Sequence, residues 1–234
     1  MVKRVIHAVL VVVSCAFVVS CSANKTRFFS SSQSVEAAHL VGPAAWHAGN
    51  ERSCLASGRV RETPYIFSRA SIGRPTGCGA ERPFVVKAAL GGHVDMRPAA
   101  TLRCNMIGPI DRWLRDVVQP AAQRRFGQNV VELKVIASYA CRSRNSKRGA
   151  KLSEHGRANA IDISAFVLSD GSRVTVKQGW SWNNRGARFL RTVHRGACSH
   201  FTTVLGPNAD KYHHDHFHFD LARHGRTGTY RVCR

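Results

Sequence analysis

The chain has 234 residues, 44% of them hydrophobic, which is enough to bury one sizeable core behind a targeting segment. It carries 35 Lys and Arg against 14 Asp and Glu, a formal net charge of +21 at pH 7, which favours anionic partners. Its eight prolines form no repeat, so a Pro-rich rod is excluded. Few aromatic residues accompany the basic ones, so nucleic acid is not an expected partner.

The first 20 residues are predicted to be an export signal. Lys3 and Arg4 precede an apolar run over residues 8–19, which is too short to be a comfortable membrane span. The pattern Val-Val-Ser-Cys ending at Cys21 resembles a bacterial lipobox, and Cys21 is therefore the expected lipidated N-terminus. The same short pattern ends at Cys15, and ordinary signal cleavage is the alternative.

After the signal, residues 21–36 are polar and Ser-rich, as expected for a flexible tether. Residues 37–234 are predicted to form one domain. Over residues 37–92 the pattern is irregular, with Gly and Pro punctuation, and indicates loops and short strands that include Phe84–Val86.

The clearest helix covers Thr101–Val118, where apolar residues recur at intervals of three and four. Pro120 is expected to end or kink this helix. Val130–Tyr139 alternates apolar and charged residues, which predicts a strand, and Arg142–Leu152 then forms a long basic loop. An Asp-Gly turn after Leu168 predicts a hairpin.

The second half of the chain predicts one helix, Gly186–Ala197, and a set of strands: Ala160–Ser164, Val174–Val176, Thr202–Leu205 and His216–Leu221. Together these elements predict a single α+β domain with helices packed on a mostly antiparallel sheet.

Six cysteines fall inside the predicted domain. An even number in an exported chain indicates three disulfides, and the absence of Cys-x-x-Cys argues against a cysteine zinc knuckle. The best single pairing is Cys141–Cys198, because Cys141 follows a predicted core strand and Cys198 follows a helix expected to pack on it. The six cysteines are Cys54, Cys78, Cys104, Cys141, Cys198 and Cys233.

The most informative stretch is His213–Asp220, which contains four histidines and two aspartates in eight residues. A strand places alternate side chains on opposite faces, so His216, His218 and Asp220 share one face and the intervening phenylalanines share the other. A row of imidazoles backed by aromatic rings suits a metal site on a rigid sheet. The alternative is a solvated His-rich surface segment.

A second segment supplies the missing ligands. Gly156 and Asn159 argue against a helix there, so His155 is expected on a loop and Asp162 on the strand that follows. If this strand lies beside the His216–Leu221 strand, then His155, Asp162 and His218 converge. Two imidazoles and one carboxylate leave one coordination position open, as in catalytic zinc sites, which acidify a bound water.

These residues resemble a known zinc signature. Ser153-x-His155-x6-Asp162 followed by Asp215-x-x-His218 is similar to the pattern of D-Ala-D-Ala carboxypeptidases, lysostaphin-type endopeptidases and the hedgehog signalling domain. The chain resembles the bacterial extensin-like C-terminal domain more closely, over roughly Cys54 to Asp220. The segments that carry this likeness are residues 138–142, 153–155, 204–207 and 215–220.

The resemblance implies roles for individual residues. His155, Asp162 and His218 match the zinc ligands. Asp215 matches the general-base carboxylate of the carboxypeptidases, and His216 matches the first histidine of the endopeptidase His-x-His pair. Arg142 resembles the arginine that holds a substrate carboxylate or carbonyl, although the usual order Ser-Gly-Tyr-Arg-Ser is here Ser-Tyr-Ala-Cys-Arg-Ser.

The expected function is therefore a zinc-dependent peptidase acting on peptidoglycan stem peptides or cross-links, exported and held to the membrane through Cys21. The expected partner is peptidoglycan or another anionic envelope polymer. The alternatives are a non-catalytic zinc-containing envelope-binding lipoprotein, as the hedgehog resemblance implies, and a soluble periplasmic or secreted enzyme. A nucleic-acid binder driven by charge alone is the third hypothesis.

Overall fold

The computed structural model of the chain describes residues 43–73 and 77–234. The predicted export signal, Cys21 and the tether lie outside the described residues.

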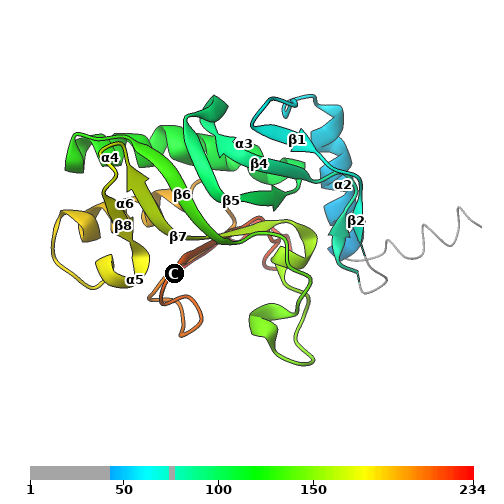
Figure 1. Cartoon of the computed structure of the whole chain (residues 1–234). Helices are drawn as coiled ribbons and strands as arrows, with labels where there is room; N and C mark the ends of the chain where they lie inside the picture. The colour runs from blue at the N-terminus through cyan, green and yellow to red at the C-terminus, as the bar shows by residue number, and fades with distance from the viewer. Residues whose placement is uncertain (1–42, 74–76) are drawn as a thin grey trace, which may run out of the picture. The chain divides into compact units, whose positions relative to one another are not determined.

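A nine-stranded sheet forms the framework of the domain (Figure 1). Its strands are β1 (Ile66–Ser68), β4 (Phe84–Ala89), β5 (Val94–Leu102), β6 (Val130–Ala137), β7 (Ala160–Leu168), β8 (Arg173–Thr175), β9 (Thr203–Leu205), β10 (Phe217–Asp220) and β11 (Val232–Cys233). The order is β1-β4-β5-β6-β7-β10-β9-β11, and β8 pairs with β7. The pairs β5–β6 and β9–β11 are parallel, and the other pairs are antiparallel, so the sheet is mostly antiparallel, as predicted.

The described residues also contain a small β-hairpin and five α-helices. The hairpin pairs β2 (Ile72–Gly73) with β3 (Gly79–Ala80). The helices are α2 (Pro43–Ala56), α3 (Cys104–Trp113), α4 (Gln119–Phe126), α5 (Val176–Gly179) and α6 (Arg185–Ala197). Figure 1 shows α3, α4 and α6 gathered on one face of the large sheet. The fold is therefore α+β.

The core lies between these helices and the sheet, and Trp113 is at its centre. Its ring centroid lies 6.0 Å from that of Phe166 on β7 and 5.1 Å from that of Phe219 on β10. Its indole Nε1 donates a hydrogen bond to the carbonyl of Val193 on α6 at 2.9 Å, so the polar end of this buried side chain is satisfied. This packing fixes the helix face of β7 and β10, and the opposite face of both strands is left for polar side chains.

The helix α2 was not predicted, because residues 37–92 were expected to hold only loops and short strands. Its apolar residues do not recur at three and four, so the sequence carries no helical period. Tertiary contacts stabilise it instead. The carboxylate of Glu51 is buried and accepts hydrogen bonds from the backbone N–H groups of Glu81 and Arg82 at 3.0 and 3.1 Å.

The prediction for Thr101–Val118 was wrong at both ends. Strand β5 runs to Leu102, and the helix begins at Cys104. Pro120 does not end it, because a π-helical turn over Leu114–Val118 leads directly into α4. In that wider turn the N–H of Gln119 bonds to the carbonyl of Leu114, which changes the bonding pattern just before the proline that lacks a donor.

Three disulfides form, as predicted, but the expected pair Cys141–Cys198 is wrong. The bonds are Cys54–Cys104, Cys78–Cys141 and Cys198–Cys233, with Cα–Cα distances of 5.9, 5.7 and 5.9 Å. A disulfide requires Cα atoms within about 7 Å of each other, and neither strand nor helix assignments state that distance.

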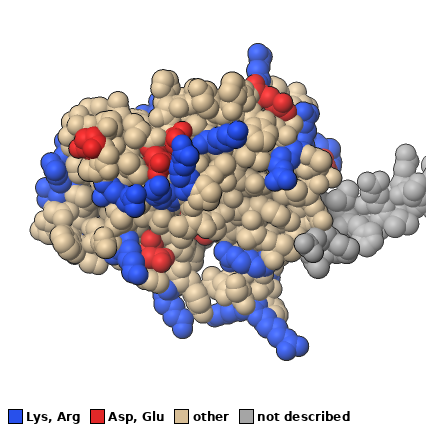
Figure 2. Space-filling model, viewed as in Figure 1, with Lys and Arg blue, Asp and Glu red and all other residues tan. Residues whose placement is uncertain are grey.

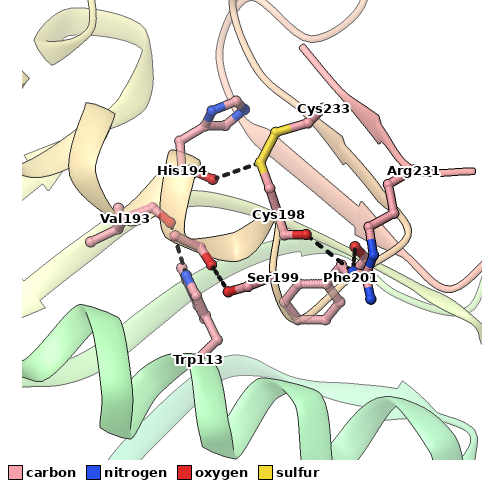
Figure 3. Close-up of a disulfide and its surroundings, with 9 residues drawn as sticks. Trp113, Val193, His194, Cys198, Ser199, Phe201, Arg231 and Cys233 are labelled. Atoms are coloured by element: carbon pink, nitrogen blue, oxygen red, sulfur yellow. Dashed lines mark hydrogen bonds between the residues drawn. A yellow bond between two sulfur atoms is a disulfide. The ribbon is translucent and has the colours of Figure 1, made fainter.

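The disulfide Cys198–Cys233 ties the last strand to the end of α6 (Figure 3). Arg231 strengthens this connection, since its Nη1 donates to the carbonyls of Cys198 at 3.1 Å and Phe201 at 2.7 Å. Strand β11 is held beside β9 in this way, although its side chains contribute little to the core.

Candidate metal centre

The pairing of β7 with β10 brings the predicted ligands together. In this antiparallel pair His218 lies directly opposite Asp162. Ile161 and Ile163 point into the core, so Asp162 points to the other face of the sheet. Alternation therefore places a carboxylate and an imidazole side by side on the polar face, as the sequence predicted.

A short 3₁₀ turn over Glu154–Arg157 supplies the third side chain. Ser153 caps this turn, with its hydroxyl accepting a hydrogen bond from the N–H of His155 at 3.4 Å. Gly156 is required by close packing, because a Cβ there would lie 2.9 Å from Leu152 Cδ1 and 3.2 Å from Cys78 Sγ. The turn directs His155 toward the strand pair, where its side chain is buried.

The three side chains form a compact cluster. His155 Nε2 lies 3.1 Å from Asp162 Oδ2, and His218 Nδ1 lies 2.8 Å from Asp162 Oδ1. The two facing imidazole nitrogens are 3.2 Å apart, and the potential ligand atoms all lie within 4.8 Å of one another. In a search of the described residues for three or more His, Cys, Asp or Glu side chains close enough to bind one metal ion, this cluster is the group found.

The outer nitrogen of each imidazole has its own partner. His155 Nδ1 donates to the carbonyl of Ser138 at 2.6 Å, and His218 Nε2 lies 2.9 Å from Asp220 Oδ2. Asp220 is positioned in turn by the N–H of Ala222, which donates to its Oδ1 at 2.8 Å. Such outer contacts fix the ring orientation and tautomer of metal-binding histidines, so each ring presents a defined nitrogen to the cluster.

The electrostatics of the cluster favour a positive charge at its centre. Burial alone would lower the pKa of His218, but hydrogen bonds with Asp162 and Asp220 outweigh it and raise the pKa to about 10. Burial likewise opposes ionisation of Asp162, yet contacts with the two imidazoles hold its pKa far below the usual range. A proton now shared by this cluster therefore occupies a place that a divalent cation can take, which fits a metal centre.

The cluster lies in a cavity of about 500 Å³, and two of the three other predicted site residues line it. His216 is buried, and its Nε2 is 3.7 Å from Asp162 Oδ1. Arg142 is half-buried at the cavity wall, and no side-chain partner for its guanidinium is found among residues 43–73 and 77–234.

Asp215 does not line this cavity. Its Oδ1 instead accepts a hydrogen bond from His216 Nδ1 at 2.8 Å, and this bond holds the pKa of Asp215 below its ordinary value. The structure thus separates the two base candidates that the sequence left open: His216 faces the cavity, and Asp215 supports it from behind.

One further histidine at the cavity was missed by the sequence analysis. His213 is buried, with its ring centroid 5.3 Å from that of His216 and 5.6 Å from that of His218. Its Nδ1 lies 2.7 Å from Asp210 Oδ1, so it is held by a carboxylate just as His216 is held by Asp215. The spacing His-x-x-His-x-His is visible in the sequence and was the available signal.

The rim of the cavity is basic on one side. The loop that follows Arg142 contributes Arg144, Asn145 and Ser146 to the lining. Figure 2 shows Lys and Arg side chains projecting at the lower edge of the molecule, where Figure 1 places this loop. Lys147 reaches across, and its Nζ lies 5.4 Å from the ring centroid of Tyr212, another lining residue. Positive charge is therefore concentrated on this side of the cavity, whose lining also holds carboxylates.

A family model, extensin-like protein C-terminus, matches residues 52–234. The chain belongs to this family. No curated protein and no solved structure matches the chain. None of the helices in the described residues combines the length and the apolar composition that a membrane span requires.

Proposed function

We propose that this extensin-like domain is a zinc-dependent peptidase that hydrolyses peptide bonds of peptidoglycan, in stem peptides or in cross-links. The observation that carries the proposal is the cluster of His155, Asp162 and His218 in a cavity. Two imidazoles and one carboxylate are a known ligand set for catalytic zinc, and they leave a position for water or substrate. The outer contacts to Ser138 and Asp220 support a metal role, because they orient both rings.

A zinc ion on these three side chains would polarise the scissile carbonyl and make a water nucleophilic near neutral pH. The protein supplies the proton transfers. His216 is the proposed general base. Its Nδ1–H donates a hydrogen bond to Asp215, so its Nε2, which lies near Asp162, is the nitrogen that can accept a proton. The same imidazole then returns the proton to the leaving amine, and the Asp215 carboxylate stabilises its charged form in between.

His213 is the proposed second imidazole of the site. Burial lowers its pKa more than Asp210 raises it, and its Nδ1 lies 2.7 Å from Asp210 Oδ1, which directs Nδ1–H to that carboxylate. Its Nε2 is then available as an acceptor beside His216, and it can help to position the attacking water. Arg142 is proposed to hold a carbonyl or carboxylate of the substrate through its guanidinium.

Peptidoglycan is the proposed substrate because of the compartment and the charge. Three disulfides suit an oxidising location outside the cytoplasm. A formal charge of +21 and a basic cavity rim favour an anionic polymer that bears carboxylates. Membrane attachment through Cys21 would keep the enzyme near this substrate.

The test is to incubate the purified, zinc-loaded protein with muropeptides and to analyse the products by mass spectrometry. Cleavage is expected with about one zinc per chain, and His216→Ala is expected to lower turnover by roughly a hundredfold while zinc is retained. Asp215→Asn should act in the same direction, because it removes the group that orients His216. Release of a terminal residue or loss of a cross-link will distinguish carboxypeptidase from endopeptidase.

His214→Ala is the matched control for these variants. His214 lies in the same His-rich segment, but its side chain is exposed and does not line the cavity. It should leave turnover unchanged. A zinc-loaded wild-type protein that cleaves no muropeptide but binds peptidoglycan would refute the peptidase and favour the envelope-binding alternative.

A further inference from the structure

A second cavity, of about 730 Å³, lies beside α2, β1 and α3. It shares no lining residue with the cavity of the metal centre. Its floor is apolar: Ile66 comes from β1, Ala88 from β4 and Ile107 from α3, and all three side chains are buried. The disulfide Cys54–Cys104 forms part of the wall and links the two helices that bound the cavity.

The rim of this second cavity is cationic. Arg59 and Arg61 reach it from the segment after α2, and Arg112 and Arg115 reach it from the end of α3 and the π turn. A single acidic residue, Asp111, lines it together with the four arginines. The rim therefore has an excess of three positive charges.

Two of the charged groups are already engaged. Arg115 donates to the carboxylate of Asp116 at 2.8 and 3.2 Å, and Asp111 Oδ1 accepts from the N–H of Leu90 at 2.9 Å. Within the part of the chain that the structure describes, no side-chain hydrogen bond or ion pair is found for the guanidinium groups of Arg59, Arg61 and Arg112. Arg112 does lie near Asp111, because burial raises the pKa of that carboxyl and the charge of Arg112 opposes the rise. These three side chains are exposed, and an anion bound between them would gain charge-assisted hydrogen bonds.

The start of α3 adds to the positive potential. Cys104 and Asn105, in its first turn, line the cavity, and no side chain caps this end of the ten-residue helix. The helix dipole favours an anion near this end of the helix. Gly108 keeps the next turn open, because a Cβ there would lie 3.2 Å from Arg112 Nη1, so this guanidinium lies close over the helix backbone.

We infer that this cavity binds a small amphiphilic anion, a phosphate or carboxylate group carried on an apolar body. The anionic group would lie against Arg59, Arg61 and Arg112, and the apolar body would cover the floor formed by β1, β4 and α3. The volume is within the usual range for small-molecule sites, which are mostly apolar with a few polar groups that fix orientation. The inference does not depend on the proposed peptidase function.

The test is calorimetric titration of the full-length protein with octyl phosphate, with inorganic phosphate and octanol as partial probes. Octyl phosphate should bind saturably and more tightly than inorganic phosphate or octanol, because it alone can contact the arginines of the rim with its phosphate and the apolar floor with its alkyl chain. Arg59→Gln combined with Arg112→Gln should weaken its binding at least about tenfold, the loss expected when charged hydrogen bonds are removed. The other pair, Arg61→Gln with Arg115→Gln, is an independent second variant.

Arg124→Gln combined with Arg125→Gln is the matched control. It removes the same two charges from the exposed end of α4, away from the cavity, and should leave binding unchanged. Dihexanoyl phosphatidylglycerol binding more tightly than octyl phosphate would identify a lipid headgroup as the source of the anion, and the reverse order would identify a free amphiphile. Equal octyl phosphate affinity in the wild type and both rim variants, or no saturable binding at all, would overturn the inference.

Discussion

Asp220 shows how one residue outside the ligand set shapes the candidate metal centre. It shares a strand face with His218 and contacts the ring nitrogen that points away from the cluster. The Nδ1 atom of His218 is thereby directed to Asp162 and His155. A metal site on this strand pair depends on this buried carboxylate as well as on the three ligands.

Replacing Asp220 by Asn is expected to weaken zinc binding by about 10-fold to 100-fold, the usual effect of losing a carboxylate behind a ligand histidine. His155→Ala, which removes a ligand, should abolish stoichiometric zinc binding. Both affinities can be measured by competition with a chromogenic chelator. Unchanged zinc affinity in folded Asp220→Asn would show that this carboxylate does not position the ligand.

His194 is a buried imidazole that the proposed chemistry does not use. It lies on α6 near the disulfide shown in Figure 3, with its ring centroid 5.0 Å from that of Phe217. Burial lowers the pKa of His194 to about 4, because it outweighs the contacts with the backbone of Arg234 and Leu205 that raise this pKa.

This shift predicts a pH-dependent stability. His194 takes up a proton near pH 6.5 in the unfolded chain but only near pH 4 in the folded chain. Its burial therefore does not affect the free energy of unfolding above pH 6.5, and it lowers that free energy as the pH falls from 6.5 to 4. The loss is about 3 kcal/mol between pH 7 and pH 4. Urea unfolding of the metal-free protein should show that His194→Gln removes this part of the acid destabilisation. If the free energy of unfolding fell equally with decreasing pH in the wild type and in His194→Gln, the prediction would be wrong.

At the scale of elements, two structural features assemble the site: the β7–β10 strand pair and the turn that carries His155. The first places Asp162 and His218 on the same face of the sheet through the alternation of side chains along each strand. The second depends on the disulfide Cys78–Cys141, because Gly156 in the turn packs against Cys78 Sγ and Arg142 follows directly after Cys141. The disulfide thus connects the small β2–β3 hairpin to the wall of the cavity.

Removing this disulfide with Cys78→Ser and Cys141→Ser should lower the free energy of unfolding by about 4 kcal/mol, as expected for a loop of 63 residues. It should also weaken zinc binding, because the turn of His155 loses its support. The matched control is Cys198→Ser with Cys233→Ser, which opens a loop of 35 residues and should lower stability similarly with zinc affinity retained. Equal zinc affinity in both double variants would refute the supporting role.

At the scale of the whole molecule, the proposal combines the basic charge with attachment to a membrane. In the proposed location, the basic charge would draw the domain toward anionic envelope surfaces, and salt would screen this attraction. The proposed lipid on Cys21 would hold the protein independently of salt, since acyl insertion is not electrostatic. The basic domain could then reach the cell wall while its N-terminus stays attached to the membrane.

Cys21→Ser is accordingly expected to move the protein from the membrane to the soluble fraction, whereas Cys15→Ser should not. High salt should strip the Cys21→Ser variant from membranes and leave the wild type attached. Fractionation with immunodetection measures both effects. A mature N-terminus beyond Cys21 in mass spectrometry, without lipid, would instead indicate a soluble periplasmic or secreted enzyme.

Much of the architecture follows from local patterns in the sequence. The strands around the site and the helix α6 were predicted because alternation and a three-to-four period report which face of an element is buried. The same alternation predicted that Asp162 and His218 share the polar side of the sheet. The helix α2 carried no such period, and it forms because Glu51 and Cys54 find partners far away in the chain.

The sequence by itself determined the residue types and their strand faces, because these depend on neighbours within a few positions, and its resemblance to a zinc signature pointed to His155, Asp162 and His218 as candidate ligands. Only the tertiary structure decided which cysteines pair, that His216 rather than Asp215 faces the cavity, and that four arginines surround a second cavity. The physical reason is that these properties are distances between segments that are remote in sequence. Such distances are set by the packing of the whole core, and they cannot be predicted from the spacing of apolar residues along a single helix or strand.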